Sequence, residues 1–235
     1  NVRISLTGGE PCVHPMFEQL VEYARPKIKW ISVTTNATRK ADFYHRLPID
    51  HLVFSLHFED TAWENRLETI ISYALYEKGI PYTVNLMAHQ DCMEDVKKAA
   101  YTLEMFDIPF VVRRVRWTVA HDWFDDLKYN SQDLDWILTT SATAGANTIV
   151  DNSELVHTND LIKQNRNQFK GWKCRAGIES LMINWDGEVH RATCRVGGSL
   201  GNIYTDTFKQ PTTEIDCTRR YCTCAADVNI TKWKP

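Results

Sequence analysis

The sequence predicts an α/β fold, a partial (β/α)6 TIM-type barrel whose first strand is missing, followed by a small cysteine-rich domain that contains a hairpin. Two observations lead to this prediction. Five extended, β-branched segments alternate with helix-like stretches, and five of the seven cysteines lie in the last quarter of the 235 residues. Strand and helix units that recur in this way favour a parallel sheet or part of a barrel. With 43% apolar residues, the chain is also able to bury a full core.

The first part of the chain carries the alternating units. Strands are expected over residues 2–7, 30–35, 51–57, 82–88 and 110–117, and helices over 16–24, 63–78 and 131–145. Gly79 and Pro81 end the second helix and begin the next strand. In folds of this kind, ligands bind at the carboxyl ends of the strands.

The second part of the chain reads differently. Helical periodicity fades from Asn147 onward, which places a domain boundary near residue 150 and predicts domains at 1–150 and 151–235. Asp186 and Gly187 lie between two short strand-like segments, 180–185 and 188–191, and both residue types accept the positive φ of a tight turn. We therefore expect a hairpin there.

Composition excludes several classes of partner. Lys and Arg number 27 and Asp and Glu 30, so a formal charge of -3 predicts neither a nucleic-acid surface nor attachment to an anionic membrane. No apolar run is long enough to span a bilayer and no leader precedes the first strand, so a cytoplasmic protein is expected. Because the chain opens at Asn1 directly into a strand, we expect a truncated sequence that lacks an upstream element.

The cysteines predict a thiolate site. An odd number of cysteines without a leader favours reduced thiols. The tail group has enough sulfur atoms for an iron-sulfur cluster or a soft metal, since four thiolates complete either site and one of the five cysteines is then surplus. It consists of Cys174, Cys194, Cys217, Cys222 and Cys224. Structural zinc remains an alternative, although the paired C-x-x-C spacing typical of zinc sites is missing.

A second candidate site follows the first strand. Gly8 and Gly9 let a ligand approach the backbone, Glu10 adds a carboxylate able to hold an ammonium group, and Pro11 fixes the exit from the loop. The alternative is a simple turn from strand to helix. The position at a strand's carboxyl end favours a site.

Together these motifs resemble radical S-adenosylmethionine (radical SAM) enzymes with a C-terminal SPASM or twitch-type auxiliary domain. The resemblance rests on Gly8-Gly9-Glu10-Pro11, the strand end at Asn36, and the tail from Cys174 through Asp186-Gly187 to Cys194, and it covers nearly the whole chain. It implies that the GGEP segment binds the methionyl amino group of S-adenosylmethionine. It also implies that Asn36 and Ser55 contact the ribose and carboxylate of this cofactor.

The same resemblance implies further cofactors and partners. The tail cysteines would hold one auxiliary 4Fe-4S cluster, and a flavodoxin or ferredoxin would supply single electrons. The full protein would cleave S-adenosylmethionine reductively to a 5'-deoxyadenosyl radical that abstracts a substrate hydrogen. The substrate would be a peptide, a nucleoside or a small metabolite. The CxxxCxxC motif of the family is missing, is expected before residue 1, and leaves this chain by itself inactive.

Two functions from other classes stay open. His57, His89 and His121 follow three successive strands and would suit a metal-dependent barrel hydrolase. A non-enzymatic module with a structural zinc or iron-sulfur site would explain the tail cysteines alone.

Overall fold

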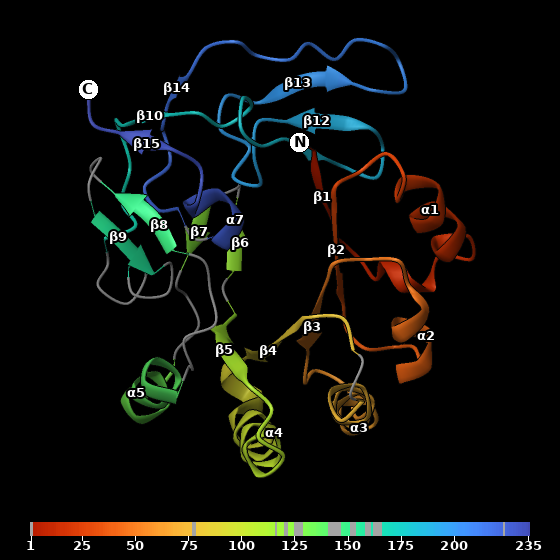
Figure 1. Ribbon diagram of the computed structural model, residues 1–235. Coiled ribbons are helices and arrows are strands. Elements are labelled where there is room, and N and C mark those ends of the chain that lie inside the picture. The colour runs from red at the N-terminus through yellow and green to blue at the C-terminus, as the bar shows by residue number, and fades with distance from the viewer. Residues whose placement is uncertain are drawn as a thin grey trace. The chain divides into compact units, whose positions relative to one another are not determined.

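The computed structural model describes residues 2–76, 79–115, 117–119, 122–124, 129–140, 147–150, 154–157, 161, 166–222 and 224–235. These residues form two compact units (Figure 1). Unit 1 comprises Asn1–Val115 and Leu127–Ala144, and unit 2 comprises Arg116–Asp126 and Gly145–Pro235.

Unit 1 is built on a five-stranded parallel sheet whose strands follow chain order (Figure 1). The strands are β1 (Arg3–Leu6), β2 (Trp30–Thr35), β3 (His51–Leu56), β4 (Tyr82–Ala88) and β5 (Phe110–Arg114). The five strands expected from the sequence are confirmed, although β5 ends at Arg114 and not at residue 117. Among the described residues β1 pairs with β2 alone and β5 with β4 alone, so this sheet does not close into a barrel.

The helices of unit 1 connect these strands. They are α1 (Phe17–Ala24), α2 (Ala41–Arg46), α3 (Trp63–Ala74), α4 (Met93–Met105) and α5 (Ser131–Thr140), with short 3-10 turns η1 (Pro11–Val13) and η2 (Gln90–Cys92). The expected helix at 63–78 ends earlier, at Ala74. Residues 141–145 of the expected last helix lie outside the described residues.

One face of the sheet packs against the helices and forms the core. The strand side chains of this face alternate along the chain, as the period of two requires. Those from β2 to β4 are Ile31, Val33, Leu52, Phe54, Leu56, Val84, Leu86 and Ala88, all 0% exposed. Each large side chain of this kind contributes about 1.5–3 kcal/mol when it is fully buried.

The other face of the sheet is polar and half-buried. Ser55 pairs in register with Asn85, whose Oδ1 accepts a bond of 3.3 Å from Arg113 Nε. On the same face, His51 Nε2 lies 3.2 Å from Thr83 Oγ1. Because parallel strands buried on both faces are usually apolar throughout, this polar face is typical of a sheet that faces a ligand space.

Unit 2 consists of short strands and loops. One three-stranded sheet has the order β14 (Ile215–Asp216), β10 (Lys173–Cys174), β15 (Lys232–Trp233). A second has the order β11 (Met182–Ile183), β12 (Glu188–His190), β13 (Ser199–Asn202). The strand pairs β6 (Trp117–Val119) with β7 (Asp122–Phe124) and β8 (Asn147–Val150) with β9 (Glu154–His157), and the helix α7 (Ala225–Val228), complete the unit.

The hairpin expected around Asp186 and Gly187 is confirmed. β11 and β12 pair antiparallel across this turn, and Gly187 has φ +83°. A Cβ atom at Gly187 would lie 2.5 Å from Cδ2 of Tyr204, so both the backbone conformation and the packing require glycine. Within the described parts of the chain, we find no helix with the length and apolar character needed to cross a membrane.

Candidate functional site

The loop after β1 has the backbone conformation that only glycine adopts easily. Gly8 has φ +89° and Gly9 has φ +48°, and a Cβ atom added to either would meet nothing within 4 Å. The two glycines therefore serve the conformation of the loop and not packing within the chain. The space beside the loop is open to a ligand.

Glu10 joins the carboxyl ends of the first two strands. Its Oε2 accepts a bond of 2.6 Å from the backbone N–H of Asn36, just beyond β2. Its Oε1 accepts from Thr35 Oγ1 at 2.8 Å and from the N–H of Cys12 at 3.0 Å. Pro11 stands at the first position of η1, where a missing N–H costs nothing, and Glu10 caps that turn.

A buried polar chain supports Glu10 from behind. The Thr35 hydroxyl donates to Glu10, so the Tyr44 hydroxyl, 3.1 Å away, donates to Thr35. Tyr44 in turn accepts from the N–H of Arg39 at 3.1 Å, and burial raises its pKa to about 12. These bonds hold the turn after β2, in which Ala37 has the unusual φ of +62°.

Asn36 and Ser55 were expected to contact a cofactor. Asn36 Oδ1 is buried and has no hydrogen-bond partner among the described residues. Such a buried amide oxygen is rare in proteins and indicates a group that a ligand or water satisfies. Ser55 lies one residue before the end of β3, on the polar face of the sheet.

The sequence suggested that the Glu10 carboxylate holds an ammonium group. In the structure, this carboxylate already accepts three hydrogen bonds from the chain itself. Its observed role is to fix the glycine loop against the end of β2. The open backbone of Gly8 and Gly9 and the unpartnered Asn36 oxygen leave polar groups available to a ligand at this edge.

Unit 2 brings four of the five tail cysteines to one cavity. Cys174, Cys194, Cys217 and Cys222 line this cavity, whereas Cys224 does not. The sheet of β10, β14 and β15 explains part of this arrangement. Cys174 pairs with Ile215 of β14, and Cys217 follows Ile215 by two residues. Residues two apart in an extended segment share a face, so both sulfur atoms lie on one side of the sheet.

The backbone N–H groups of Cys194, Cys217 and Cys222 are each held by a hydrogen bond. Cys217 N–H donates to Trp172 O at 2.8 Å, and Cys222 N–H donates to Asn167 O at 2.9 Å. Cys194 N–H donates to the Asp227 carboxylate at 2.8 Å. Although these residues come from distant parts of the sequence, the loops around the cavity are thus ordered by bonds that the chain supplies.

Burial decides the protonation of these thiols. It raises the pKa of Cys194 to about 12 and also raises the pKa of Cys174, Cys217 and Cys222. The thiols are therefore neutral at pH 7, and metal binding would displace their protons. No group of three or more His, Cys, Asp or Glu in the described part of the chain is already in position to hold a metal ion. The donor set itself, the sulfur atoms of three buried cysteines and the half-buried Cys194, suits a soft metal or an iron-sulfur cluster.

Three charged residues of this cavity, Arg219, Asp227 and Lys232, were missed from the sequence. Asp227 and Lys232 line it together with the cysteines, and they are only 2% and 5% exposed. Neither stands in a recognisable motif. The one sequence signal for Lys232 is its place within a short strand-like segment near the end of the chain.

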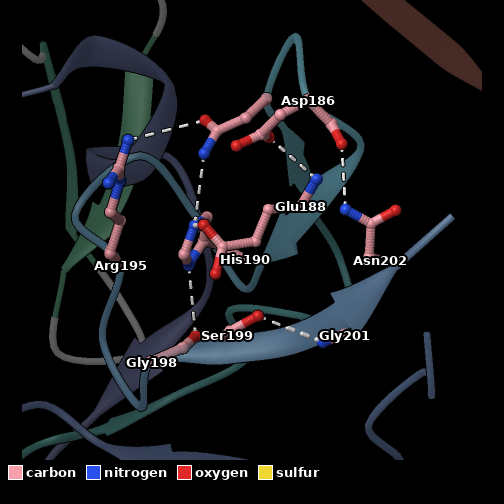
Figure 2. Close-up of polar contacts among 9 residues, drawn as sticks. Asp186, Glu188, His190, Arg195, Gly198, Ser199, Gly201 and Asn202 are labelled. Atoms are coloured by element: carbon pink, nitrogen blue, oxygen red, sulfur yellow. Dashed lines mark hydrogen bonds and ion pairs between the residues drawn. The ribbon is translucent and has the colours of Figure 1, made fainter. Parts of the chain in front are cut away.

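A polar network orders the hairpin that precedes Cys194 (Figure 2). The buried His190 ring lies 3.1 Å from Glu188 Oε2 through Nε2 and 3.3 Å from the carbonyl oxygen of Gly198 through Nδ1. Figure 2 also shows Asn202 bonded to the carbonyl oxygen of Asp186 across the turn, at 2.9 Å. These contacts fix the strands on both sides of the turn that carries Cys194.

The histidines of the hydrolase hypothesis make local contacts. His57 Nδ1 lies 3.5 Å from Glu59 Oε1, and His89 Nδ1 lies 3.6 Å from Asp91 Oδ2. His121 lies outside the described residues. His57 and His89 belong to no group of metal ligands among the residues that the structure describes.

Comparison with known proteins supports the fold. No family model matches the sequence, and no curated protein matches it either. Two solved structures of Streptococcus suis SuiB are similar. The first, bound to S-adenosylmethionine, has 17% identity and a TM-score of 0.51 and covers 87% of this chain. The second, bound to the precursor peptide SuiA, has the same identity and TM-score and covers 89%.

The aligned region covers only part of each SuiB chain. The chain spans 52% and 54% of the two SuiB chains, or about half of their length. At this identity, the similarity establishes that the chain shares an α/β fold with SuiB.

Proposed function

We propose that this chain is part of a radical SAM enzyme, which binds S-adenosylmethionine at the Gly8-Gly9-Glu10 loop and cleaves it reductively. The observation that carries the proposal is the junction made by Glu10, which fixes an open glycine loop at the carboxyl edge of a parallel sheet. Asn36 and Ser55 are proposed as further cofactor contacts. The protein's part is to bind and orient the cofactor, while an iron-sulfur cluster supplies the electron when bound.

The fold comparison supports this proposal, because SuiB shares the fold and binds S-adenosylmethionine. SuiB also binds a precursor peptide, so among the three substrate classes left open by the sequence we propose a peptide. A flavodoxin or ferredoxin remains the proposed electron donor. We further propose that the sheet is part of a (β/α)6 barrel, with residues 1–150 as the core domain and 151–235 as the auxiliary domain.

Cofactor binding is tested with two glycine variants of matched backbone strain. Gly8 and Gly171 have φ of +89° and +85°, and a Cβ atom at either would meet nothing within 4 Å. We expect Gly8→Val to bind radiolabelled S-adenosylmethionine at least tenfold more weakly in equilibrium dialysis, because the side chain enters the open space beside the loop. Gly171→Val is expected to bind like the wild type.

The dialysis is performed on the gene product that carries this chain, with circular dichroism to confirm that both variants fold. Equal binding by Gly8→Val and Gly171→Val would contradict a cofactor site at the loop. Absence of binding by the folded wild type would contradict the proposed function.

We also propose that Cys174, Cys194, Cys217 and Cys222 bind an auxiliary 4Fe-4S cluster. The cavity that these four residues share supports this assignment and leaves Cys224 outside the ligand set. Residues of the chain would exclude water from the cluster, since Ala176, Ala192, Val196 and Ile230 line the same cavity.

Metal content tests the cluster. The gene product that carries this chain is reconstituted anaerobically with iron and sulfide, and its metal content is compared with that of a Cys222→Ser variant. The wild type should contain about four more irons and four more sulfides per chain. Cys224→Ser is the matched control and should retain them. One zinc and no iron at this cavity would favour the non-enzymatic module with a structural metal site.

A further inference from the structure

Lys232 is a buried cation in the wall of the cysteine cavity. It is 5% exposed, lines the cavity, and pairs directly opposite Cys174 in the register of β10 and β15. Directly paired residues of antiparallel strands place their side chains on the same face. The ammonium group and the Cys174 sulfur therefore belong to the same side of the sheet.

Backbone carbonyl oxygens occupy all three N–H groups of this ammonium. Lys232 Nζ donates to the carbonyl oxygens of Asp227 at 2.5 Å, Ile230 at 2.8 Å and Val228 at 3.3 Å. It also lies 5.2 Å from the ring centroid of Phe169. These contacts hold the charge in one place.

The three hydrogen-bond partners of the ammonium are neutral carbonyl oxygens, so none of them carries a negative charge. Within the part of the chain that the structure describes, no carboxylate forms an ion pair with Lys232. Burial of an ammonium is costly, and proteins normally place an anion or a metal-bound anion beside it. The carboxylate of Asp227 lines the same cavity, but it accepts hydrogen bonds from the N–H groups of Thr193 and Cys194 and forms no ion pair with Lys232. The groups that share this cavity and become negative on metal binding are the four cysteines.

We propose that Lys232 is a positioning residue whose fixed charge balances the thiolates of the metal group bound at this cavity, and so helps to set the reduction potential of that group. This inference rests on the proposed auxiliary cluster. Reduction by an external one-electron donor adds one negative charge to the bound group and breaks no bond. A nearby fixed cation in a poorly solvated site favours the more negative state, so it raises the potential.

Asp227 provides a charge of opposite sign at the same cavity. It is 2% exposed, and its carboxylate accepts from the N–H of Thr193 at 3.2 Å and of Cys194 at 2.8 Å. By the same reasoning, removal of this negative charge should raise the potential. The two residues thus predict shifts of opposite sign.

The test is a potentiometric titration, with dithionite as the reductant and electron paramagnetic resonance as the readout. Lys232→Gln keeps a donor for the carbonyl oxygens and removes the charge, whereas Lys232→Arg keeps the charge. Lys173→Gln is the matched control, because Lys173 is the residue before Cys174 in β10. The Lys173 side chain is 38% exposed, and its ammonium pairs with Asp216 at 2.7 Å.

We expect the ratio of reduced to oxidised cluster at a given potential to fall at least tenfold in Lys232→Gln, which corresponds to about 59 mV for one electron. Lys232→Arg and Lys173→Gln should stay close to the wild type. A wild-type protein without iron at the cavity would overturn the proposed cluster itself. Iron in the wild type, with equal potentials in Lys232→Gln and Lys173→Gln, would overturn only the role of Lys232.

If Lys232→Gln does not fold, Asp227→Asn decides the question together with Lys232→Arg. A rise of at least tenfold in the same ratio for Asp227→Asn, with Lys232→Arg unchanged, supports control of the potential by the buried charges of the cavity. An unchanged potential in Asp227→Asn overturns it.

Discussion

The junction at Glu10 makes a quantitative prediction for the variant Glu10→Gln. Glutamine keeps an oxygen at the Oε1 position, which can still accept from Thr35 and Cys12. It places an NH2 group at the Oε2 position, opposite the N–H of Asn36, where the wild-type bond is 2.6 Å long. Two donors then face each other.

The magnitude follows from the loss of one hydrogen bond to a charged acceptor. Such a bond contributes about 1.5–3 kcal/mol to the free energy of unfolding. Because Glu10 is half-buried, we take a value of about 2 kcal/mol, near the lower end of that range. Each 1.36 kcal/mol is a factor of ten, so the amide of Asn36 should exchange about 30-fold faster with solvent deuterium.

Hydrogen exchange read by NMR at the Asn36 amide is the direct assay, with urea unfolding of the same samples as the second measurement. Glu18→Gln is the matched control, because Glu18 forms an exposed pair with Arg46 at 3.5 Å. Exposed pairs contribute about 0–1 kcal/mol. If Glu10→Gln and Glu18→Gln have the same Asn36 exchange rate and the same urea midpoint, the reasoning about the junction is wrong.

Two further predictions concern stability alone. Hydrogen bonding to Arg25, at 2.5 Å, lowers the pKa of Asp50 below its usual 3.8. The charged carboxylate therefore stabilises the fold above pH 3.8. This stabilisation is lost as the pH falls through the lower pKa of the folded state. Asp50→Asn should therefore lose less stability than the wild type between pH 4 and pH 2 in urea titrations, and an unchanged acid dependence would contradict the effect. Leu52→Ala should lower the free energy of unfolding by about 2–5 kcal/mol, because Leu52 is fully buried. Leu20→Ala, at a helix position that is 49% exposed, should change this free energy by less than about 0.5 kcal/mol. Similar losses in the two variants would show that Leu52 is not a core residue.

The parallel sheet of unit 1 was predictable because its information is local. Leu52, Phe54 and Leu56 alternate with His51, Val53 and Ser55, and the alternation indicates a strand whichever neighbours it has. The strand ends then place Glu10, Asn36 and Ser55 near one edge. The exposed Leu20 shows the limit of this reasoning, because an apolar residue in a helix of unit 1 is still 49% exposed.

The cysteine cavity was only partly predictable. Cysteine number and density indicated a thiolate site, but they could not separate Cys224 from Cys222, two residues away. That separation depends on where the chain turns after β14 and on the bonds between Cys222 and Asn167, which are 55 residues apart in sequence. Spacing along the chain carries no information of this kind.

Residue type and local spacing were therefore enough to predict the five strands of unit 1, the glycine loop and the group of cysteines near the end of the chain, but not the helices α2 and α4. The donors that Glu10 binds, the four cysteines that share a cavity and the burial of Lys232 beside them are visible only in the folded chain. The physical reason is that hydrogen bonds, burial and electrostatic fields arise between residues that are distant in the chain, and their strength depends on geometry and exclusion of water that exist only after folding.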